Sequence, residues 1–328
     1  MATLHVFNPD HDYALAVGIN VYVSPMKIKL IARQFESLPA YWADSDDFIL
    51  KTDNTVCRVC DARFFEICEA KSQIDRISPW GWDHSLVMRL GSAGFDERLL
   101  PTRENLIEMQ RLSHRRISID LNRELGFRHL PVECFSPEEA MDFLKRKGYA
   151  FFKAPWSSSG RGIVNSRRMP EENLLAWIKG IINKQGSVLA ECGAEKRIDF
   201  ASLWNCGSEG VEFKGFSITE ADDKGQYLGN YCAPQAMLTE QISKYTSEDP
   251  EKLINTQKAF IEKRIYPGYR GPLGIDMLID SEGTVWPGIE INLRNTMGHA
   301  AMAYQKYLDT CNDGVWQPDP FDIFIPLQ

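Results

Sequence analysis

GPLGIDMLIDSEGTVWPGIEINLRN, residues 271 to 295, contains the most informative pattern in the chain. Apolar and polar residues alternate on both sides of an Asp-Ser-Glu-Gly turn, which predicts two antiparallel strands joined as a hairpin. If the turn has an odd number of residues, the two-residue side-chain period places Asp276, Glu290 and Asn292 on one face. Pro287-Gly288 is expected to introduce a bulge in the second strand, which leaves the register open.

The polar face of this hairpin has the oxygen ligands that Mg2+ prefers. Two carboxylates and an amide oxygen would converge there, leaving the remaining coordination positions to water and substrate phosphates. The hairpin therefore predicts a magnesium site made by Asp276, Glu290 and Asn292. An ordinary solvated acidic face is the alternative that this stretch alone leaves open.

The composition is that of a globular protein with two or three domains. The 328 residues are 44% apolar and 25% charged, and the net charge is -8. The excess of acidic residues argues against nucleic acid as a partner, because such a partner requires a basic surface. The sequence has neither a signal-peptide pattern nor an apolar run of the ~18 residues that span a bilayer, so we expect a cytoplasmic protein with no membrane partner.

Eight cysteines occur in the chain, and we expect them to be reduced thiols rather than a disulfide framework. Cys57 and Cys60 have the spacing of zinc ligands, but no second pair follows. A zinc site at this pair is the less favoured alternative.

The first hundred residues alternate between strand and helix patterns, which is typical of an α/β domain. Strands are predicted at residues 3–7 and 47–50, and helices at 25–38 and 60–71. Residues 8–18 are rich in turn-forming residues and predict a polar loop at the end of the first strand. In this loop, Asp10, His11 and Asp12 are candidate substrate contacts; alternatively, they form a turn that caps the next segment.

After residue 101 the pattern becomes mainly helical. A helix is predicted from residue 104 to Gly126, with His114, Arg115 and Arg116 inside it, where a solvated cationic face is the alternative reading. A second helix is predicted at residues 135–148, with Ser136 as its N-cap and Gly148 at its end.

Residues 151–164, FFKAPWSSSGRGIV, predict a strand followed by a loop of small residues. Backbone amides from Ser157 to Gly162 could approach phosphate oxygens closely, and Lys153 on the strand would supply a point charge. The order differs from a Walker A motif, in which the lysine follows the glycines. A hairpin tip without a ligand is the alternative.

A helix predicted at 171–184 leads to two strands within residues 187–204. Glu191 ends the first strand and Asp199 begins the second. Their carboxylates could accept hydrogen bonds from ribose hydroxyls or an amino group, while the backbone at 191–193 could bind a purine edge. Surface acids beside a turn are the ordinary alternative. A strand that contains Lys214 and a helix at 248–264 then lead to the hairpin.

The chain thus has, in order, a strand lysine before a small-residue loop, a strand that ends in glutamate, and a hairpin with Asp and Glu-x-Asn-x-Arg. This order resembles the ATP-grasp superfamily, in which a nucleotide lies between two α+β lobes. The resemblance covers roughly residues 100 to 300 and implies an α/β plus α+β fold. It implies an N-terminal α/β domain at 1–100, a first lobe with a phosphate-binding flap at 101–186, and a second lobe with the metal-binding hairpin at 187–328.

The resemblance also implies a role for each candidate residue. Lys153 matches the phosphate-binding lysine, Glu191 the residue at the adenine hinge and Asp199 the ribose-binding acid. Asp276, Glu290 and Asn292 match the magnesium ligands. Arg294 matches the catalytic arginine that holds the transferring phosphate or the substrate acid. The implied ATP contacts are Arg115, Arg116, Lys153, Ser157, Ser158, Ser159, Gly160, Arg161, Gly162, Glu191, Cys192, Gly193, Asp199 and Lys214. Substrate contacts are expected at Asp10, His11, Asp12 and His299.

The sequence departs from the superfamily pattern at two places. His114-Arg115-Arg116 stands where a lysine is usual, which leaves open which arginine contacts phosphate, or whether either does. Three serines, Ser157 to Ser159, stand in the flap where glycines are common, and they permit close approach less freely.

The activity that the resemblance implies is an ATP- and Mg2+-dependent ligase. Such an enzyme joins a small-molecule carboxylate to an amine or similar nucleophile through an acyl phosphate, with two Mg2+ expected and Mn2+ as an alternative metal. A phosphotransferase acting on a hydroxyl, or a nucleotide-binding module without turnover, are the alternatives. The sequence names no substrate, and it leaves open whether the protein forms a homodimer.

Overall fold

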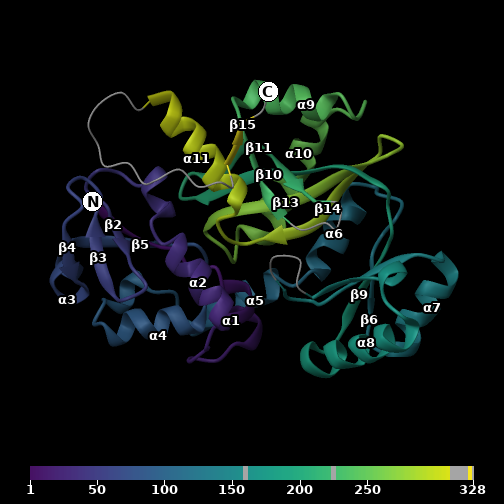
Figure 1. Cartoon of the computed structure of the whole chain (residues 1–328), viewed down its shortest axis with the longest axis horizontal. Coiled ribbons are helices and arrows are strands. Elements are labelled where there is room, and N and C mark those ends of the chain that lie inside the picture. Colours follow the sequence, from purple (N-terminus) through teal and green to yellow (C-terminus); the bar gives the residue numbers. More distant parts are fainter. Residues whose placement is uncertain (158–161, 223–226, 311–323, 327–328) are drawn as a thin grey trace.

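The computed structural model describes residues 1–157, 162–222, 227–310 and 324–326. Figure 1 shows three regions, each with its own sheet: the N-terminal region in purple and blue, a large sheet in green and yellow, and a small sheet in teal. Within the described residues, no helix is both long enough and apolar enough to cross a membrane.

The N-terminal region is an α/β domain, as the sequence predicts. Its five-stranded sheet has the order β4-β3-β2-β1-β5, and strand β1 runs parallel to both of its neighbours, β2 and β5. Buried apolar residues of these strands pack against α4. The strands are β1 (Ala2–Val6), β2 (Phe48–Leu50), β3 (Thr55–Arg58), β4 (Phe64–Glu66) and β5 (Ile74–Pro79). The helices are α1 (His11–Val17), α2 (Met26–Gln34), α3 (Ile67–Ala70) and α4 (His84–Ser92), with 3-10 turns at Leu38–Tyr41, Lys71–Gln73 and Glu97–Leu99.

Two predictions in this region are wrong. The expected loop at residues 8–18 contains helix α1, which buries Ala14 and Leu15 and ends at Gly18 with a positive φ of 65°. Gln110, far along the chain, donates to the last carbonyls of α1, a stabilisation that no local pattern shows. The expected helix at residues 60–71 is only the short α3, because the preceding residues pair with β3 as strand β4.

The helix predicted from residue 104 to 126 is two helices, α5 (Arg103–Leu112) and α6 (Arg116–Glu124). The helix is interrupted between them because the backbone N–H of Arg115 donates to the carbonyl of Pro155 rather than to a carbonyl within the helix. His114 and Arg115, at the break, are buried. The solvated-face reading is therefore wrong for these two residues, although Arg116 remains half exposed.

The small sheet has the strand order β6-β9-β7-β8, and α7 and α8 pack against it. Helix α7 begins as predicted, with the Ser136 hydroxyl accepting from the Glu139 N–H, and it ends at Gly148 in a left-handed conformation. The strands are β6 (Val132–Cys134), β7 (Ala150–Lys153), β8 (Ile163–Asn165) and β9 (Val188–Cys192), and the helices are α7 (Pro137–Lys147) and α8 (Glu171–Gln185), with a 3-10 turn at Ser166–Arg168.

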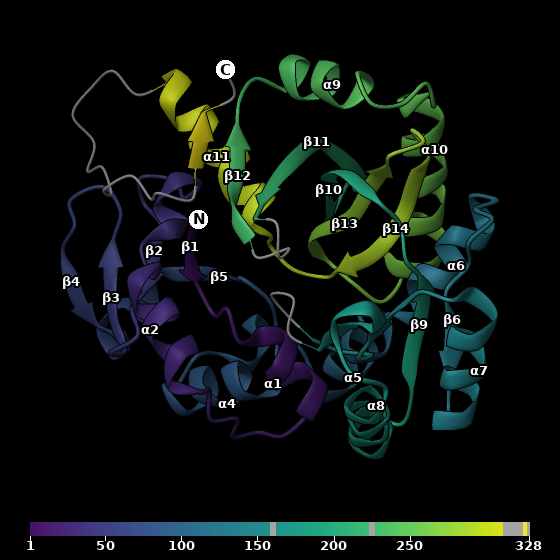
Figure 2. The ribbon, with the colours of Figure 1, turned by 45° about the vertical axis from the view of Figure 1, so that its right-hand side comes forward.

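The large sheet has the order β14-β13-β10-β11-β12-β15, and Figure 2 shows α9 and α10 lying beside it. Its neighbouring strands are antiparallel except for β12 and β15. The strands are β10 (Lys196–Gly207), β11 (Gly210–Ala221), β12 (Tyr227–Cys232), β13 (Gly271–Asp280), β14 (Val285–Asn292) and β15 (Phe324–Pro326). The helices are α9 (Gln235–Ser243), α10 (Pro250–Phe260) with a π-helical turn at Ile261–Ile265, and α11 (Met297–Thr310).

The expected division between the lobes at residue 186 does not follow the sheets. Strand β9 pairs with β6 and β7, so it belongs with the small sheet although it follows residue 186. Apolar side chains of α5 and α6, such as Leu112 and Leu121, are part of the core under the large sheet. The chain therefore crosses between the two lobes at about residues 125–131 and 193–195, rather than once.

The hairpin of residues 271–295 forms as predicted. Asp276 pairs with Glu290 and Gly274 with Asn292, so the two-residue period brings all three polar side chains to one face. The Asp280 N–H donates to the Thr284 carbonyl, which leaves a three-residue turn and confirms the odd number. The register shifts beyond Asp276, opposite Pro287-Gly288, where the bulge was expected.

Candidate functional site

The polar face of the hairpin joins the three predicted metal ligands. Asn292 Nδ2 donates to Asp276 Oδ2 at 3.0 Å, and Glu290 is the register partner of Asp276 on the neighbouring strand. Burial raises the pKa of Asp276, and the nearby Glu290 carboxylate raises it further. Two partly buried carboxylates beside an amide oxygen fit a divalent cation, because its charge would offset their repulsion and its preferred ligands are oxygen atoms.

Arg294 lies at the end of this face and binds across two domains. Its Nε donates to Asp12 Oδ2 at 2.9 Å, and its Nη2 donates to Asn292 Oδ1 at 3.0 Å. Burial disfavours the charged guanidinium, but the carboxylates of Asp12, Glu290 and Asp276 outweigh that effect and raise the pKa of Arg294. Arg294 therefore remains a fixed positive charge beside the predicted metal ligands.

Arg115 approaches the same face from the break between α5 and α6. Its Nη2 donates to Glu290 Oε1 at 2.7 Å, and its Nη1 donates to the Ser157 hydroxyl at 2.8 Å and to the Ala154 carbonyl. The side chain thus connects the loop after β7 with the hairpin. Arg116 points elsewhere and pairs with Glu133 at 2.7 Å. The sequence left open which of Arg115 and Arg116 contacts phosphate, and in the structure it is Arg115 that lies at the hairpin.

Lys153 and Glu191 form a buried ion pair on the small sheet. Lys153 Nζ and Glu191 Oε2 are 2.7 Å apart, and both side chains are less than a tenth exposed. Glu191 is the register partner of Phe151, so it lies on the same sheet face as Lys153, two residues further along β7. When a ligand binds, the lysine could instead contact an anionic group of the ligand, and the carboxylate could accept a hydrogen bond from it.

Asp199 connects the two sheets electrostatically. It lies on β10 two residues from Ala201, the register partner of Asp276, so both aspartates occupy one face of the large sheet. Burial raises the pKa of Asp199, while Lys196, its ion-pair partner, and Lys153 act in the opposite direction. The charges of the two lobes therefore act on one another across this region.

Two short segments border these charges. At the end of β9, the N–H of Gly193, next to Cys192, donates to the Tyr149 carbonyl; a Cβ on Gly193 would lie 1.9 Å from the Tyr149 ring. In the loop after β7, the Ala154 N–H donates to the Gly162 carbonyl at 2.7 Å, and Gly162 has a positive φ of 77°. Four of the expected flap contacts, Ser158, Ser159, Gly160 and Arg161, lie outside the described residues.

The remaining candidates are placed in different ways. Asp12 reaches the site through Arg294, whereas Asp10 accepts a hydrogen bond from Ser24. His11 is fully buried, and burial lowers its pKa to about 4. Burial also lowers the pKa of His299 to about 4, and its ring contacts Thr296 and the Trp204 carbonyl. Lys214 is paired with Glu212 on the exposed part of β11.

Trp156 is a residue of the site that the sequence did not reveal. Its indole N–H donates to the Gln110 carbonyl at 2.9 Å, its backbone N–H donates to Gln185, and its ring meets His114 edge-on at 4.5 Å. These contacts fix the start of the loop that holds Ser157. In the sequence, Trp156 is a single large aromatic residue in a stretch of small residues. A tryptophan that only packs in the core would look the same, so the sequence alone does not assign it to the site.

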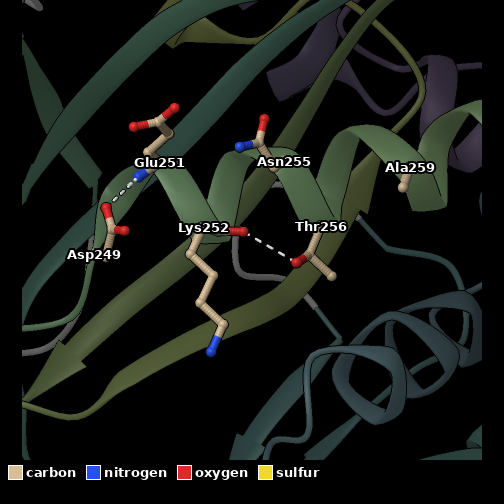
Figure 3. Close-up of a pocket in the computed structure, with 6 residues that line it drawn as sticks. All are labelled: Asp249, Glu251, Lys252, Asn255, Thr256 and Ala259. Atoms are coloured by element: carbon tan, nitrogen blue, oxygen red, sulfur yellow. Dashed lines mark hydrogen bonds between the residues drawn. The ribbon is translucent and has the colours of Figure 1, made fainter.

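A surface hollow of about 600 Å³ lies apart from these residues, along α10. Figure 3 shows its side chains on one outer face of the helix, with Asp249 accepting from the Glu251 N–H and Thr256 donating to the Lys252 carbonyl. Its polar groups bond within the helix rather than converging, so it adds nothing to the site. Its lining residues are Asp249, Glu251, Lys252, Asn255, Thr256 and Ala259.

No zinc site forms at Cys57 and Cys60. Across the residues that the structure describes, no three His, Cys, Asp or Glu side chains come together as a metal-binding group. Cys57 is buried in β3, and burial raises the pKa of its thiol, whereas Cys60 is exposed. The magnesium proposal at the hairpin accordingly depends on two carboxylates together with the Asn292 amide oxygen.

The sequence was compared with protein-family models and with curated proteins. No family model matches the sequence. A curated relative, the butirosin acyl-carrier protein–L-glutamate ligase of Niallia circulans, is 28% identical over 167 residues, which are 49% of this chain and 37% of that protein. The chain thus aligns with little more than a third of the length of this relative.

Solved structures match over most of the chain. A biotin carboxylase from Campylobacter jejuni, in a β,γ-ATP complex, is 16% identical with a TM-score of 0.53, covering 91% of this chain and 66% of its own. An N5-carboxyaminoimidazole synthetase from Staphylococcus aureus is 13% identical with a TM-score of 0.50, covering 90% of this chain and 71% of its own. Both have the ATP-grasp fold.

The chain therefore has the ATP-grasp fold, with an α/β domain before the two lobes. This confirms the fold class expected from the order of the strand lysine, the glutamate and the hairpin.

Proposed function

We propose that this protein is an ATP- and Mg2+-dependent ligase that joins a small-molecule carboxylate to an amine, a thiol or a similar nucleophile through an acyl phosphate. The observation that carries the proposal is the joint placement of Asp276, Glu290 and Asn292 with Arg115 and Arg294. These groups combine oxygen ligands for a cation with fixed positive charge, which is what transfer of a phosphoryl group requires.

The nucleotide would lie between the two sheets. Lys153 and Arg115 would bind its phosphates, and Asp199 and the end of β9 at Glu191 to Gly193 its sugar and base. Asp276, Glu290 and Asn292 would hold Mg2+, which when bound neutralises phosphate charge and orients the terminal phosphoryl group. The Lys153–Glu191 and Arg115–Glu290 pairs keep these buried charges compensated until the nucleotide arrives.

The substrate carboxylate would bind at Arg294. In the structure this guanidinium is held by the carboxylate of Asp12, and a substrate carboxylate offers the same geometry. Transfer of the terminal phosphoryl group to that carboxylate gives an acyl phosphate and ADP, and the nucleophile then displaces phosphate. Catalysis would come mainly from positioning and electrostatics, without a protein nucleophile.

The phosphate balance tests this proposal. Incubation with MgATP, a panel of amino and hydroxy acids, and a free amine or thiol should release ADP and inorganic phosphate in equal amounts, dependent on both substrates. Phosphate retained on the product would identify a kinase instead. If the protein binds ATP but releases no ADP with any acid, it is a nucleotide-binding module without turnover. The presence of all three proposed metal ligands, Asp276, Glu290 and Asn292, argues against that alternative.

We further propose that a carrier protein presents the nucleophile. The curated relative acts, by its name, on an acyl-carrier protein and L-glutamate. A carrier thiol would attack the acyl phosphate just as a free amine does, so the chemistry is the same. Use of two Mg2+ or of Mn2+, a homodimer and a cytoplasmic location remain predictions.

A further inference from the structure

Residues 17–33, at the end of α1 and through α2, form an exposed apolar and basic surface that we term the apolar–basic segment. Sixteen large apolar side chains are exposed in the part of the chain that the structure describes, and six of them fall between residues 17 and 30. Concentration of this kind marks interaction surfaces, whereas single exposed apolar residues are ordinary. The six are Val17, Ile19, Val21, Val23, Met26 and Leu30.

The backbone of this segment presents its apolar residues outward in alternation. Val21 and Val23 are 69% and 70% exposed, whereas the intervening Tyr22 and the following Ser24 are partly buried. The Tyr22 N–H donates to the Ser85 hydroxyl, and the Ser24 hydroxyl donates to Asp10. These contacts attach one side of residues 19–25 to the N-terminal domain and leave the β-branched side chains facing outward.

The charge of the segment is opposite to that of the whole chain. Lys27, Lys29 and Arg33 are exposed, and no acidic residue occurs between Asp12 and Glu36, although the net charge of the protein is -8. A cationic rim around apolar side chains complements an acidic partner with an apolar helix face, and such complementarity favours both the rate and the specificity of association.

The position of the segment connects it to the site. Helix α1 ends at Val17 and contains Asp12, the residue that binds Arg294. Figure 2 shows α1 beside α5, and the two helices pack together. Seven helical residues extend about 10 Å. The Val17 end of the segment therefore lies about one short helix from Asp12, which contacts the proposed carboxylate-binding residue Arg294.

We propose that the apolar–basic segment is the docking surface for an acidic, helical carrier protein that delivers the nucleophile. This inference rests on the proposed function. Two other occupants fit less well. A symmetric contact with a second copy would bring the same three cations together, and an anionic membrane surface would repel a chain with a net charge of -8.

Isothermal titration calorimetry with a purified acyl-carrier protein of the source organism, in its phosphopantetheinylated form, tests the inference. We expect the wild type to bind and the affinity to fall with added salt. The double variants Val21→Glu/Val23→Glu and Lys27→Glu/Lys29→Glu should each bind roughly tenfold more weakly or worse, because they remove apolar burial and reverse charge. All four side chains are exposed, so circular dichroism should show intact folding.

Matched variants on the first lobe serve as controls. Phe135→Glu changes another exposed apolar residue, and Lys145→Glu/Lys147→Glu reverses two exposed charges on α7. Both variants should bind the carrier as the wild type does. If the wild type does not bind the carrier, or if the segment variants bind it unchanged, the inference is wrong. Two other results would also overturn the inference. The wild type could dimerise, or bind phosphatidylglycerol vesicles, and the segment variants could lose that property while they still bind the carrier.

The readouts separate this inference from the proposed function. Release of ADP and phosphate with free pantetheine as the nucleophile, but without carrier binding, would support the ligase activity and contradict the docking surface. Carrier binding at the segment without turnover would support the docking surface and contradict the ligase activity.

Discussion

At the scale of single residues, the site contains charges that are already paired. Glu290 accepts from Arg115, Asp12 accepts from Arg294, and Lys153 pairs with Glu191. Each pair joins two separate segments of the chain, so a substitution at one member acts on folding as well as on ligand binding. Experiments on these residues therefore need a stability measurement beside the activity measurement.

Glu290→Gln should reduce ATP turnover roughly a hundredfold or more, because the amide keeps the volume of the side chain and loses the charge that holds Mg2+. The amide oxygen can still accept from Arg115, so folding should be retained. Turnover would be measured across a range of Mg2+ concentrations, with circular dichroism on the same samples.

The control for this variant is Glu282→Gln, which removes a carboxylate from the exposed turn of the same hairpin. It should retain wild-type turnover. Full activity of Glu290→Gln would show that the hairpin is an ordinary acidic surface.

Lys153→Ala should weaken MgATP binding by about tenfold to a hundredfold, because a charge-assisted contact is lost. The substitution also affects folding, because it leaves Glu191 buried without its partner. We expect a loss of roughly 3 kcal/mol in the free energy of unfolding.

Calorimetry and denaturant unfolding measure these two effects separately. Lys145→Ala, which removes an exposed ion pair with Asp142, should change stability by less than about 1 kcal/mol. Unchanged ATP affinity in folded Lys153→Ala would remove Lys153 from the site.

At the scale of elements, the hairpin is held by its turn. Asp280 Oδ1 accepts from the N–H groups of Glu282 and Thr284, and its Oδ2 accepts from the indole N–H of Trp286. Asp280 lies in the turn rather than on the ligand face. Through these three contacts the residue nevertheless fixes the geometry on which the ligand face depends.

Asp280→Ala should lower the free energy of unfolding by roughly 1 to 3 kcal/mol, since it leaves three donors without their acceptor. Thermal unfolding followed by circular dichroism would measure the change, with Glu282→Ala as the matched turn control. A melting temperature equal to that of the wild type would show that the turn holds without this carboxylate.

At the scale of the whole molecule, the N-terminal domain contributes its own dependence on pH. Burial tends to raise the pKa of Asp47, but hydrogen bonds from His5 and from the N–H groups of Thr3 and Asp44 outweigh it, and the pKa falls to about 2. The ionised carboxylate therefore stabilises the folded state. Because the folded pKa lies below the ordinary value, this stabilisation is complete above about pH 4 and is lost as the pH falls toward 2.

Asp47→Asn should consequently be less stable than the wild type by about 2 kcal/mol at neutral pH. The difference should shrink as the pH falls from about 4 to 2, where the wild-type carboxylate becomes protonated. Urea unfolding of both proteins at several pH values measures it. A stability difference that does not change with pH would show that the charge of Asp47 contributes nothing.

The sequence by itself determined the hairpin and its ligand face, because a strand's two-residue period and a turn's chemistry are local properties. It also determined the order of strand lysine, glutamate and acidic hairpin, and hence the fold. The N-cap of α7 and its final glycine could be predicted for the same reason: each depends on neighbours within four residues.

Only the tertiary structure decided which side chains meet. The pair of Arg294 and Asp12 joins residues 282 positions apart, and the contact of Arg115 with Glu290 spans 175. The break that directs Arg115 toward the hairpin and Arg116 away from it arises from a hydrogen bond to Pro155, and α1 ends against Gln110. These interactions join segments that are distant in the chain, so their geometry depends on how the domains pack rather than on any local pattern of residues.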